Sequence, residues 1–575
     1  MKSLLKYLKD YKKETALAPL FKMLEAIFEL FVPLVMASII DTGIANRDTD
    51  YVIRMCLVLV ALGIVGLVSA ISAQYFAAKA AVGFSAGLRS DLFKHIQSLS
   101  FTEMDTLGTS TLITRMTSDV NQVQSGVNLV LRLFLRSPFI VFGAMIMAFT
   151  IDVPAALIFV VTIPALSIVV FGIMAITMPM YKRVQKRLDS VTLRTRENLN
   201  GVRVIRAFNK ENDEIASFAA ENEGLNIAQK KVGRISGLMN PMTYVIVNVA
   251  TVVLLWTGAV RVDTGILTQG MVVALVNYMS QILVELIKLA NLIVTVSKAL
   301  ACAARIENVF NITSSMENGS ENSGTDSDVV VSFDNVSLRY ANTSEDALSN
   351  ITFDAKAGEV IGIIGATGSG KTSLVNMIPR FYDASEGSVR FLGRDVKEWD
   401  EESLKREIAT VMQKAVLFKG TIRDNVKWGK MDATDEEILK ALDVAQASEF
   451  VDKKEGRLDY SIEQEGRNLS GGQRQRLNIA RAVVAKAKVL ILDDSSSALD
   501  YATDAKLRAA LKQIGNKPTV FIVAQRAQSL MHADKIIVLD DGNIAGIGTH
   551  EELLAECDVY KEIYESQFGK GEDNE

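Results

Sequence analysis

The segment Gly365–Thr372 carries the residue types that bind a nucleoside triphosphate. Its letters, GATGSGKT, match the phosphate-loop pattern in full: a glycine-rich turn, then a lysine and a hydroxyl residue. The glycines let backbone N–H groups approach phosphate oxygens closely. We expect Lys371 to neutralise the β- and γ-phosphates and the Thr372 hydroxyl to coordinate Mg²⁺.

Two further segments of the same region suit phosphate chemistry. The apolar run VLILD ends in Asp493, so a buried strand can deliver this carboxylate rigidly to the Mg²⁺ beside the phosphate loop. The segment Asn468–Gln473 reads NLSGGQ and precedes a basic stretch from Arg474 to Arg481. Together these segments predict a magnesium-dependent nucleotide site.

The elements around these residues predict an α/β domain. A strand over Glu359–Ile364 leads into the phosphate loop, and a helix opens at Thr372. Short apolar runs alternate with helical stretches, which indicates a largely parallel sheet. We assign residues 329–575 to this domain. The polar segment 313–327, TSSMENGSENSGTDS, predicts a flexible linker, which we place at 311–328.

The first half of the chain has the composition of a membrane domain. Hydrophobic residues make up 49% of the sequence and charged residues 22%, which suits an apolar part joined to a polar part. A bilayer core needs about 20 mostly apolar residues per helix, and six stretches of residues 1–310 qualify. They are 16–41, 54–82, 128–151, 154–180, 238–261 and 266–300. The last is longer than a membrane requires and should project from it.

The positions of lysine and arginine predict the orientation. The segment 181–236 holds twelve of them, and residues 1–13 hold five lysines, whereas only Arg47 lies between the first two spans. Both termini and the long loops are therefore expected in the cytoplasm. Residues 1–13 have no apolar core and no cleavage site, so we expect an amphipathic helix on the inner membrane surface rather than a cleaved signal.

The two inner loops, about 83–127 and 181–237, have helical apolar periodicity interleaved with charge. We interpret them as membrane helices that continue into the cytoplasm, each pair joined by a short crossing segment. A separate cytoplasmic domain is the alternative, but boundaries rich in glycine and proline are missing.

The phosphate loop, LSGGQ and ILDD resemble the ATP-binding-cassette (ABC) family in order and spacing. The six preceding spans resemble its exporter branch, and the similarity covers almost the whole chain. The resemblance implies an all-α six-helix transmembrane domain followed by an α/β P-loop ATP-binding-cassette domain. It also implies ATP and Mg²⁺ as ligands, and a dimer that buries two ATP molecules between facing domains.

The resemblance assigns roles to individual residues. Tyr340 would stack on adenine, unless it is an ordinary strand aromatic, and Gln413 would touch Mg²⁺ and relay nucleotide state. Segments near 102–108 and 207–216 would be coupling helices. The other implied positions are the ATP-binding Gly365, Gly368, Ser369 and Gly370, the Mg²⁺ ligands Thr372, Gln413 and Asp493, the signature residues Ser470, Gly471, Gly472 and Gln473 that cap the facing subunit's nucleotide, and Asp500 at the dimer seam.

Two positions depart from the family's pattern. The family's catalytic glutamate is replaced by Asp494, whose carboxylate retreats by about 1.5 Å, and misplacement on that scale costs about 100-fold in rate. Gln525 stands where the family has a histidine, and an amide cannot act as an acid or base. We therefore expect a degenerate site that binds ATP but hydrolyses it slowly, in a heterodimer whose non-identical partner supplies the competent groups. A homodimer with two slow sites is the alternative.

The transported solute is less constrained. Glu25 and Glu29 share a helical face in the first span, and Glu285 lies in the sixth, so these carboxylates are candidates for a polar cavity lining. Snorkelling or fixed ion pairs between helices is the alternative. We expect efflux of drugs or other amphipathic solutes from a bacterial plasma membrane. Export of a specific peptide or lipid, or a regulatory ABC protein, stays open. The net charge of −5 gives no indication of nucleic acid.

Overall fold

The computed structural model describes residues 3–568 apart from residues 326, 342 and 496. The chain divides into two compact units. The helical unit comprises residues 1–97 and 110–312, and the sheet unit comprises residues 98–109 and 313–575.

The helical unit confirms the six predicted spans. Among the described residues, six helical segments are long and apolar enough to cross a membrane, and each contains one predicted stretch to within three residues. Their elements are η1 (Leu4–Tyr11), α1 (Lys12–Ser38), η2 (Ile39–Ile44), α2 (Thr49–Gln97), α4 (Thr109–Thr114), η3 (Arg115–Asp119), α5 (Val120–Leu133), α6 (Arg136–Ile151), α7 (Val153–Asn200), α8 (Val202–Ala207), α9 (Glu211–Gly237), α10 (Met239–Asp263) and α11 (Gln269–Phe310).

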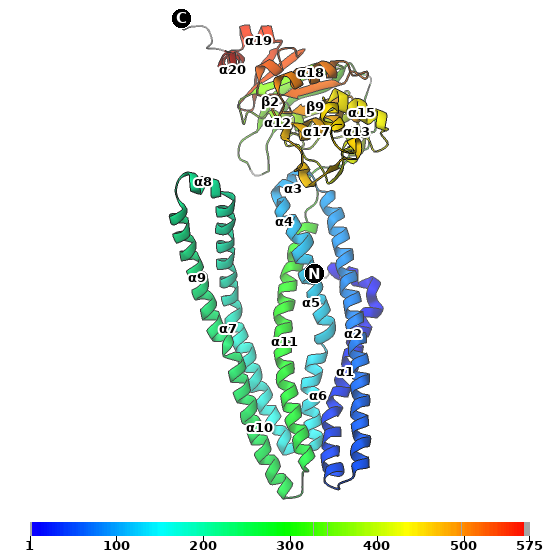
Figure 1. The fold of residues 1–575 in the computed structure, drawn as a ribbon, viewed down its shortest axis with the longest axis vertical. Coiled ribbons are helices and arrows are strands. Elements are labelled where there is room, and N and C mark those ends of the chain that lie inside the picture. Colours follow the sequence, from blue (N-terminus) through cyan, green and yellow to red (C-terminus); the bar gives the residue numbers. More distant parts are fainter. Residues whose placement is uncertain (1–2, 326, 342, 496, 569–575) are drawn as a thin grey trace. The chain divides into compact units, whose positions relative to one another are not determined.

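The predicted helical extensions are also present. α2 continues unbroken to Gln97 and α7 to Asn200, well past their apolar parts. The short helix α8 joins α7 to α9, and α7 and α9 run side by side (Figure 1). The inner loops are thus largely helical, and their helices continue from the spans α2 and α7.

The core of the helical unit lies around α11. In the most apolar stretch of 18 residues, 56% of α11 is buried, against 6% of α2. α11 is therefore central in the unit, and α2 is peripheral. Tyr278 of α11 is fully buried and donates a hydrogen bond to the Leu30 carbonyl of α1 at 2.5 Å. On the outside, large apolar side chains such as Trp256 and Ile71 are exposed. Such a surface suits a protein whose solvent is lipid.

The sheet unit contains a mainly parallel sheet of order β12-β11-β3-β10-β9-β6 and an antiparallel sheet of order β2-β1-β4-β5, with a small pair β7-β8. This arrangement confirms the predicted α/β class. The strands are β1 (Val329–Leu338), β2 (Leu348–Lys356), β3 (Val360–Gly365), β4 (Glu386–Phe391), β5 (Arg394–Asp395), β6 (Ile408–Val411), β7 (Gly420–Thr421), β8 (Ser461–Ile462), β9 (Val489–Asp493), β10 (Thr519–Val523), β11 (Lys535–Asp540) and β12 (Asn543–Gly548).

Successive side chains of the central strands point to opposite faces of the parallel sheet, so each face has its own hydrophobic core. Phe521 and Val523 of β10 join the core that includes α12, whereas Val520 and Ile522 join the core that includes α17 and α18. The helices are α3 (Phe101–Leu107), α12 (Lys371–Met377), α13 (Glu401–Glu407), α14 (Ile422–Lys427), α15 (Asp435–Val444), α16 (Ser448–Asp452), η4 (Arg457–Asp459), η5 (Gln464–Gly466), α17 (Gly471–Val484), α18 (Tyr501–Lys512), η6 (Ala527–Ser529), α19 (His550–Glu556) and α20 (Asp558–Phe568).

Candidate functional site

The phosphate loop joins β3 to α12 as the sequence predicts. Gly368 and Gly370 have φ values of 91° and 92°, a left-handed conformation that favours glycine. A Cβ at Gly370 would also meet the Ala347 carbonyl oxygen at 2.7 Å. The Lys371 ammonium donates to the carbonyls of Gly365 and Ala366 at 2.9 and 2.6 Å, which holds its charge inside the loop.

The Thr372 hydroxyl and the Asp493 carboxylate meet beside this loop. Thr372 Oγ1 lies 3.1 and 3.0 Å from the two carboxylate oxygens, and Asp493 is only 4% exposed. Burial raises the pKa of Asp493, and hydrogen bonding from Thr372 opposes that rise. A hydroxyl and a carboxylate are oxygen donors of the kind Mg²⁺ prefers, so these residues fit a magnesium ion.

The two departures from the family's pattern contact each other. Gln525 Nε2 lies 3.2 Å from Asp494 Oδ2, and Gln413 Nε2 lies 3.3 Å from the same oxygen. Asp494 follows directly on β9 and has a φ of 44°. Burial raises the pKa of the Asp494 carboxyl, against the lowering effect of the Gln413 hydrogen bond. Asp494 is thus held between two amides.

Tyr340 lines the same pocket. Its hydroxyl is 2.8 Å from Ser373 Oγ, and its ring meets that of Tyr382 edge-on with centroids 5.1 Å apart. The pocket has a volume of about 350 Å³. It brings together nine of the predicted residues, namely Tyr340, Gly368, Gly370, Lys371, Thr372, Gln413, Asp493, Asp494 and Gln525.

Gly365 and Ser369 are not among the residues that line this pocket. Gly365 lies under the loop, where a Cβ would come within 2.2 Å of the Leu539 carbonyl oxygen of β11. Ser369 is 3% exposed, and its hydroxyl oxygen lies 3.4 Å from the Lys371 ammonium. Both positions shape the loop from beneath.

The signature residues lie at the start of α17, outside the pocket. Ser470 is the N-cap: its hydroxyl accepts from the Gln473 N–H at 3.3 Å, and the Gln473 side chain accepts from the Ser470 N–H at 3.1 Å. Gly471 is exposed, and Gly472 is half-buried. Asp500 is likewise exposed at the N-cap of α18 and accepts from Thr503 N–H at 2.9 Å. The N-termini of α17 and α18 are therefore exposed at these residues.

One contact at the pocket has no signature in the sequence. The Gln567 side chain of α20 accepts from the Ala527 N–H and donates to the Gln525 carbonyl, both at 2.8 Å. One amide therefore fixes the backbone on both sides of Arg526. The two partners are 40 and 42 residues from Gln567 along the chain, so no local pattern indicates this clasp.

The first predicted coupling segment, 102–108, belongs to the sheet unit. The ring of Phe101 in α3 packs against Phe381 with centroids 4.8 Å apart. The Tyr382 hydroxyl donates to Asp105 Oδ2 at 2.6 Å. Because Tyr382 also packs on Tyr340, it links α3 to the nucleotide pocket. The other coupling segment, 207–216, lies at α8 and the start of α9 in the helical unit.

The three candidate cavity carboxylates gather around Arg136 in the helical unit. Arg136 binds Glu285 and Glu29 at 2.6 Å each, and Glu25 lies 3.7 Å away. Lys22 pairs with Glu25 at 2.6 Å, and Lys288 pairs with Glu285 at 2.8 Å. Three cations thus balance three carboxylates. These contacts favour the alternative of fixed ion pairs, although the Glu29 side chain is 40% exposed.

Comparison with known proteins finds a family match in each of the two units. The family model described as the ABC transporter transmembrane region matches residues 15–286, and the one described as ABC transporter matches residues 348–497. An uncharacterized ABC transporter ATP-binding protein of Mycobacterium tuberculosis is 35% identical over 568 residues, which cover 98% of this chain and 97% of the relative. The ATP-dependent lipid A-core flippase of Desulfotalea psychrophila is 33% identical, over 83% of this chain and 84% of the relative.

A solved bacterial Atm1-family ABC exporter with ATP bound has the same fold. Its TM-score is 0.80 at 21% identity, and the match covers 98% of this chain and 99% of that one. Six apolar helices followed by a P-loop α/β domain define an ATP-driven membrane transporter. The chain belongs to the ABC transporter family, and it is a multi-pass membrane ATPase with exporter architecture.

The Tyr382 hydroxyl offers a test of the link to α3. Tyr382→Phe keeps the ring on Tyr340 but removes the hydrogen bond to Asp105. Since bonds to charged groups contribute more than neutral ones, we expect ATP turnover during transport to fall about fivefold. ATP affinity, measured by titration of a fluorescent analogue, should stay unchanged. Tyr564→Phe on α20 is the matched control. Equal loss of affinity and turnover in Tyr382→Phe would contradict the link.

Proposed function

We propose that this chain is one subunit of a heterodimeric ABC exporter, and that its own ATP site binds nucleotide but hydrolyses it slowly. The observation that carries the proposal is the pair Asp494 and Gln525, whose side chains hydrogen-bond each other at 3.2 Å. These positions correspond to the family's glutamate and histidine. A short carboxylate held by two amides is poorly placed to polarise an attacking water.

Most of the residues expected to hold the nucleotide line the pocket. Lys371 and the loop glycines would bind the phosphates, Tyr340 would stack on the adenine, and Thr372, Gln413 and Asp493 would hold Mg²⁺. When bound, the metal ion neutralises charge on the β- and γ-phosphates. The pocket therefore combines binding capacity with weakened hydrolysis.

The intact signature supports a partner with a competent site. The exposed N-terminus of α17 offers backbone N–H groups and the positive end of the helix dipole, which suit the γ-phosphate of a facing nucleotide. Ser470 would thus complete the partner's site rather than its own. Asp500, exposed at the start of α18, would lie at the dimer seam.

The membrane setting follows from the distribution of charge. Twelve lysines and arginines in 181–236 support a cytoplasmic location for this loop and for both termini. The sheet unit would then bind ATP in the cytoplasm. The protein as a whole would lie in the plasma membrane of a bacterium. ATP-driven closure would switch the helical unit from inward to outward access.

For the substrate we propose drugs or other amphipathic solutes. The relative named a lipid A-core flippase acts on an amphipathic lipid, which supports this class without choosing between drug and lipid. Among the three carboxylates of the cluster around Arg136, Glu29 is the most exposed, and it is therefore the one best placed to contact a solute. A preference for cationic solutes would therefore depend on Glu29.

The heterodimer is tested by two substitutions in this chain, Ser470→Ala and Lys371→Ala, each measured in the complex with the partner subunit that co-purifies with the chain. Ser470→Ala should lower ATP turnover by about 100-fold, because it removes a group from the competent site. Lys371→Ala should lower it less than about tenfold, because it affects only the slow site.

The matched control is Thr434→Ala, which removes another N-cap of a capping box in the same unit. It accounts for the helix stability that Ser470→Ala also loses. In a homodimer, by contrast, either substitution alone would alter both ATP sites. Equal and complete loss of turnover with Ser470→Ala and Lys371→Ala would therefore contradict the heterodimer.

A further inference from the structure

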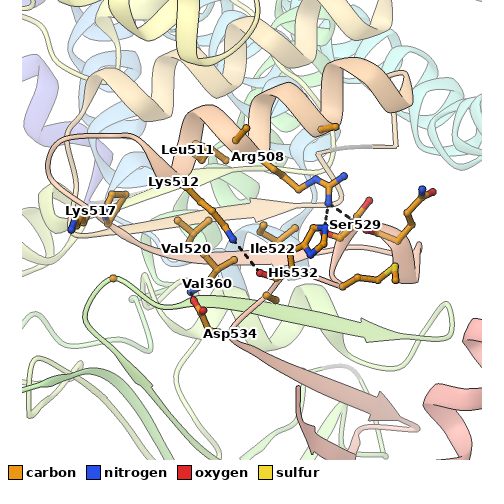
Figure 2. A pocket seen from close by; sticks show the side chains of 17 residues that line it. Val360, Arg508, Leu511, Lys512, Lys517, Val520, Ile522, Ser529, His532 and Asp534 are labelled. Carbon is orange, nitrogen blue, oxygen red and sulfur yellow. Dashed lines mark hydrogen bonds between the residues drawn. The ribbon is translucent and has the colours of Figure 1, made fainter. Parts of the chain in front are cut away.

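A second cavity lies in the sheet unit, away from the nucleotide pocket. It has a volume of about 740 Å³ and is bounded by α18, the first residue of β3, the strand β10, and η6 with the segment that follows it. Figure 2 shows its side chains between the helix and the strands. It shares no lining residue with the ATP pocket, and neither the family motifs nor the proposed function assigns it a role.

The floor of this cavity is apolar. Val520 and Ile522 of β10 point to the same face of the sheet, and Leu511 of α18 faces them across the cavity (Figure 2). These side chains are buried, at 4%, 8% and 5% exposure. Val360 extends the same surface (Figure 2). The floor therefore suits the apolar body of a ligand.

The rim carries uncompensated positive charge. Lys512 and Lys517 are exposed and have no carboxylate partner among the described residues; Lys512 makes only a 3.4 Å contact with the His532 carbonyl. Arg508, by contrast, is paired with Asp504 at 3.0 Å. The rim also holds one carboxylate, Asp534, and its Oδ2 already accepts from the Val360 N–H at 2.8 Å.

We propose that this cavity binds a small amphipathic organic anion. The apolar body would lie on Val520 and Ile522, and a carboxylate or sulfonate would lie at the rim, where Lys512 and Lys517 supply the positive charge. The volume falls in the range of ordinary small-molecule sites, about 300–1,000 Å³. An inorganic anion would leave the floor empty, and a neutral molecule would leave the two ammonium groups unpaired.

The position of the cavity connects such a ligand to the ATP site. α18 starts directly after Asp500, and η6 starts two residues after Gln525. A ligand that touches both Leu511 and Ser529 would join these two elements. Its binding is therefore expected to alter ATP turnover without competing with ATP.

The binding itself is tested by isothermal titration calorimetry on the full chain in lipid nanodiscs, with empty nanodiscs as the blank. The probes are naphthalene-2-sulfonate, its neutral sulfonamide and inorganic sulfate. The sulfonate should bind at least about tenfold more tightly than either of the others, since only it uses both the floor and the charges. Equal binding of the sulfonamide or of sulfate, or no binding of the sulfonate, would overturn the proposal.

Variants then locate the site. Lys512→Met combined with Lys517→Met should weaken sulfonate binding at least about tenfold, and Ala509→Phe should abolish it by filling the cavity. Lys506→Met, on the same helix but outside the cavity, is the matched control and should change nothing. Unchanged binding in the double variant would overturn the proposal. The comparison of probes on the unaltered chain stands even if a variant fails to fold.

Discussion

Replacing Asp494 by glutamate and Gln525 by histidine should raise ATP turnover by the purified chain about 1,000-fold. Glutamate restores the missing methylene, which we expect to contribute about 100-fold, and histidine restores an acid/base group. The φ of 44° at position 494 limits the gain, because aspartate tolerates this conformation better than glutamate. The measurement is phosphate release by the chain alone in proteoliposomes.

Two controls make this result interpretable. Lys371→Ala in the same background should abolish the gained turnover, because the lysine ammonium lies within the phosphate loop. Asp494→Asn should stay as slow as the unaltered chain. Fast turnover by the unaltered chain alone would contradict the degenerate site. So would a double variant that still binds ATP but gains no turnover.

The second large effect concerns stability. Arg136→Met should lower the free energy of unfolding of the helical unit by about 3–5 kcal/mol, because the buried Glu285 carboxylate loses its buried cation and keeps only the part-exposed Lys288, while Glu29 loses its ion pair. Arg136 itself is only 6% exposed. The measurement is unfolding in SDS, followed by the loss of helical circular dichroism.

Arg132→Met is the matched control, since Arg132 lies one turn earlier along the same span and forms no ion pair among the described residues. It should change the free energy of unfolding by less than about 1 kcal/mol. Arg136→Lys keeps the positive charge but cannot contact two carboxylates with a planar guanidinium. Its change in the free energy of unfolding should lie between those of Arg136→Met and Arg132→Met. If Arg136→Met unfolded like the unaltered chain, the cluster would not stabilise the unit.

The six spans could be predicted from the sequence because each depends on local information, and the phosphate loop is equally local. A run of apolar residues is sufficient to define a span, and the phosphate loop carries its own turn geometry in Gly368 and Gly370. The helical character of the inner loops, about 83–127 and 181–237, could also be predicted. Their apolar residues recur with the period of a helix, and charged residues lie between them. The position of Asp493 followed from a buried strand, which β9 confirms.

The remaining contacts depend on how distant elements face each other. The sequence places Arg136 and Glu285 in membrane helices but cannot say which helix faces they occupy, and the pair is separated by 149 residues. The clasp of Gln567 on Gln525 and the bond from Tyr382 to Asp105 are equally non-local. A glutamine or tyrosine has no spacing that marks such a role.

The central place of α11 constrains how the chain can be assembled. A ribosome delivers Arg136 to the membrane before it has made Glu285, 149 residues later. Until then the arginine has only Glu25 and Glu29 of the first span as partners. The span with the largest buried share is also the last to be synthesised, so the contacts that the earlier five spans make with it can form only after all five have been made. Final consolidation of the bundle is therefore a late event, completed when the sixth helix enters.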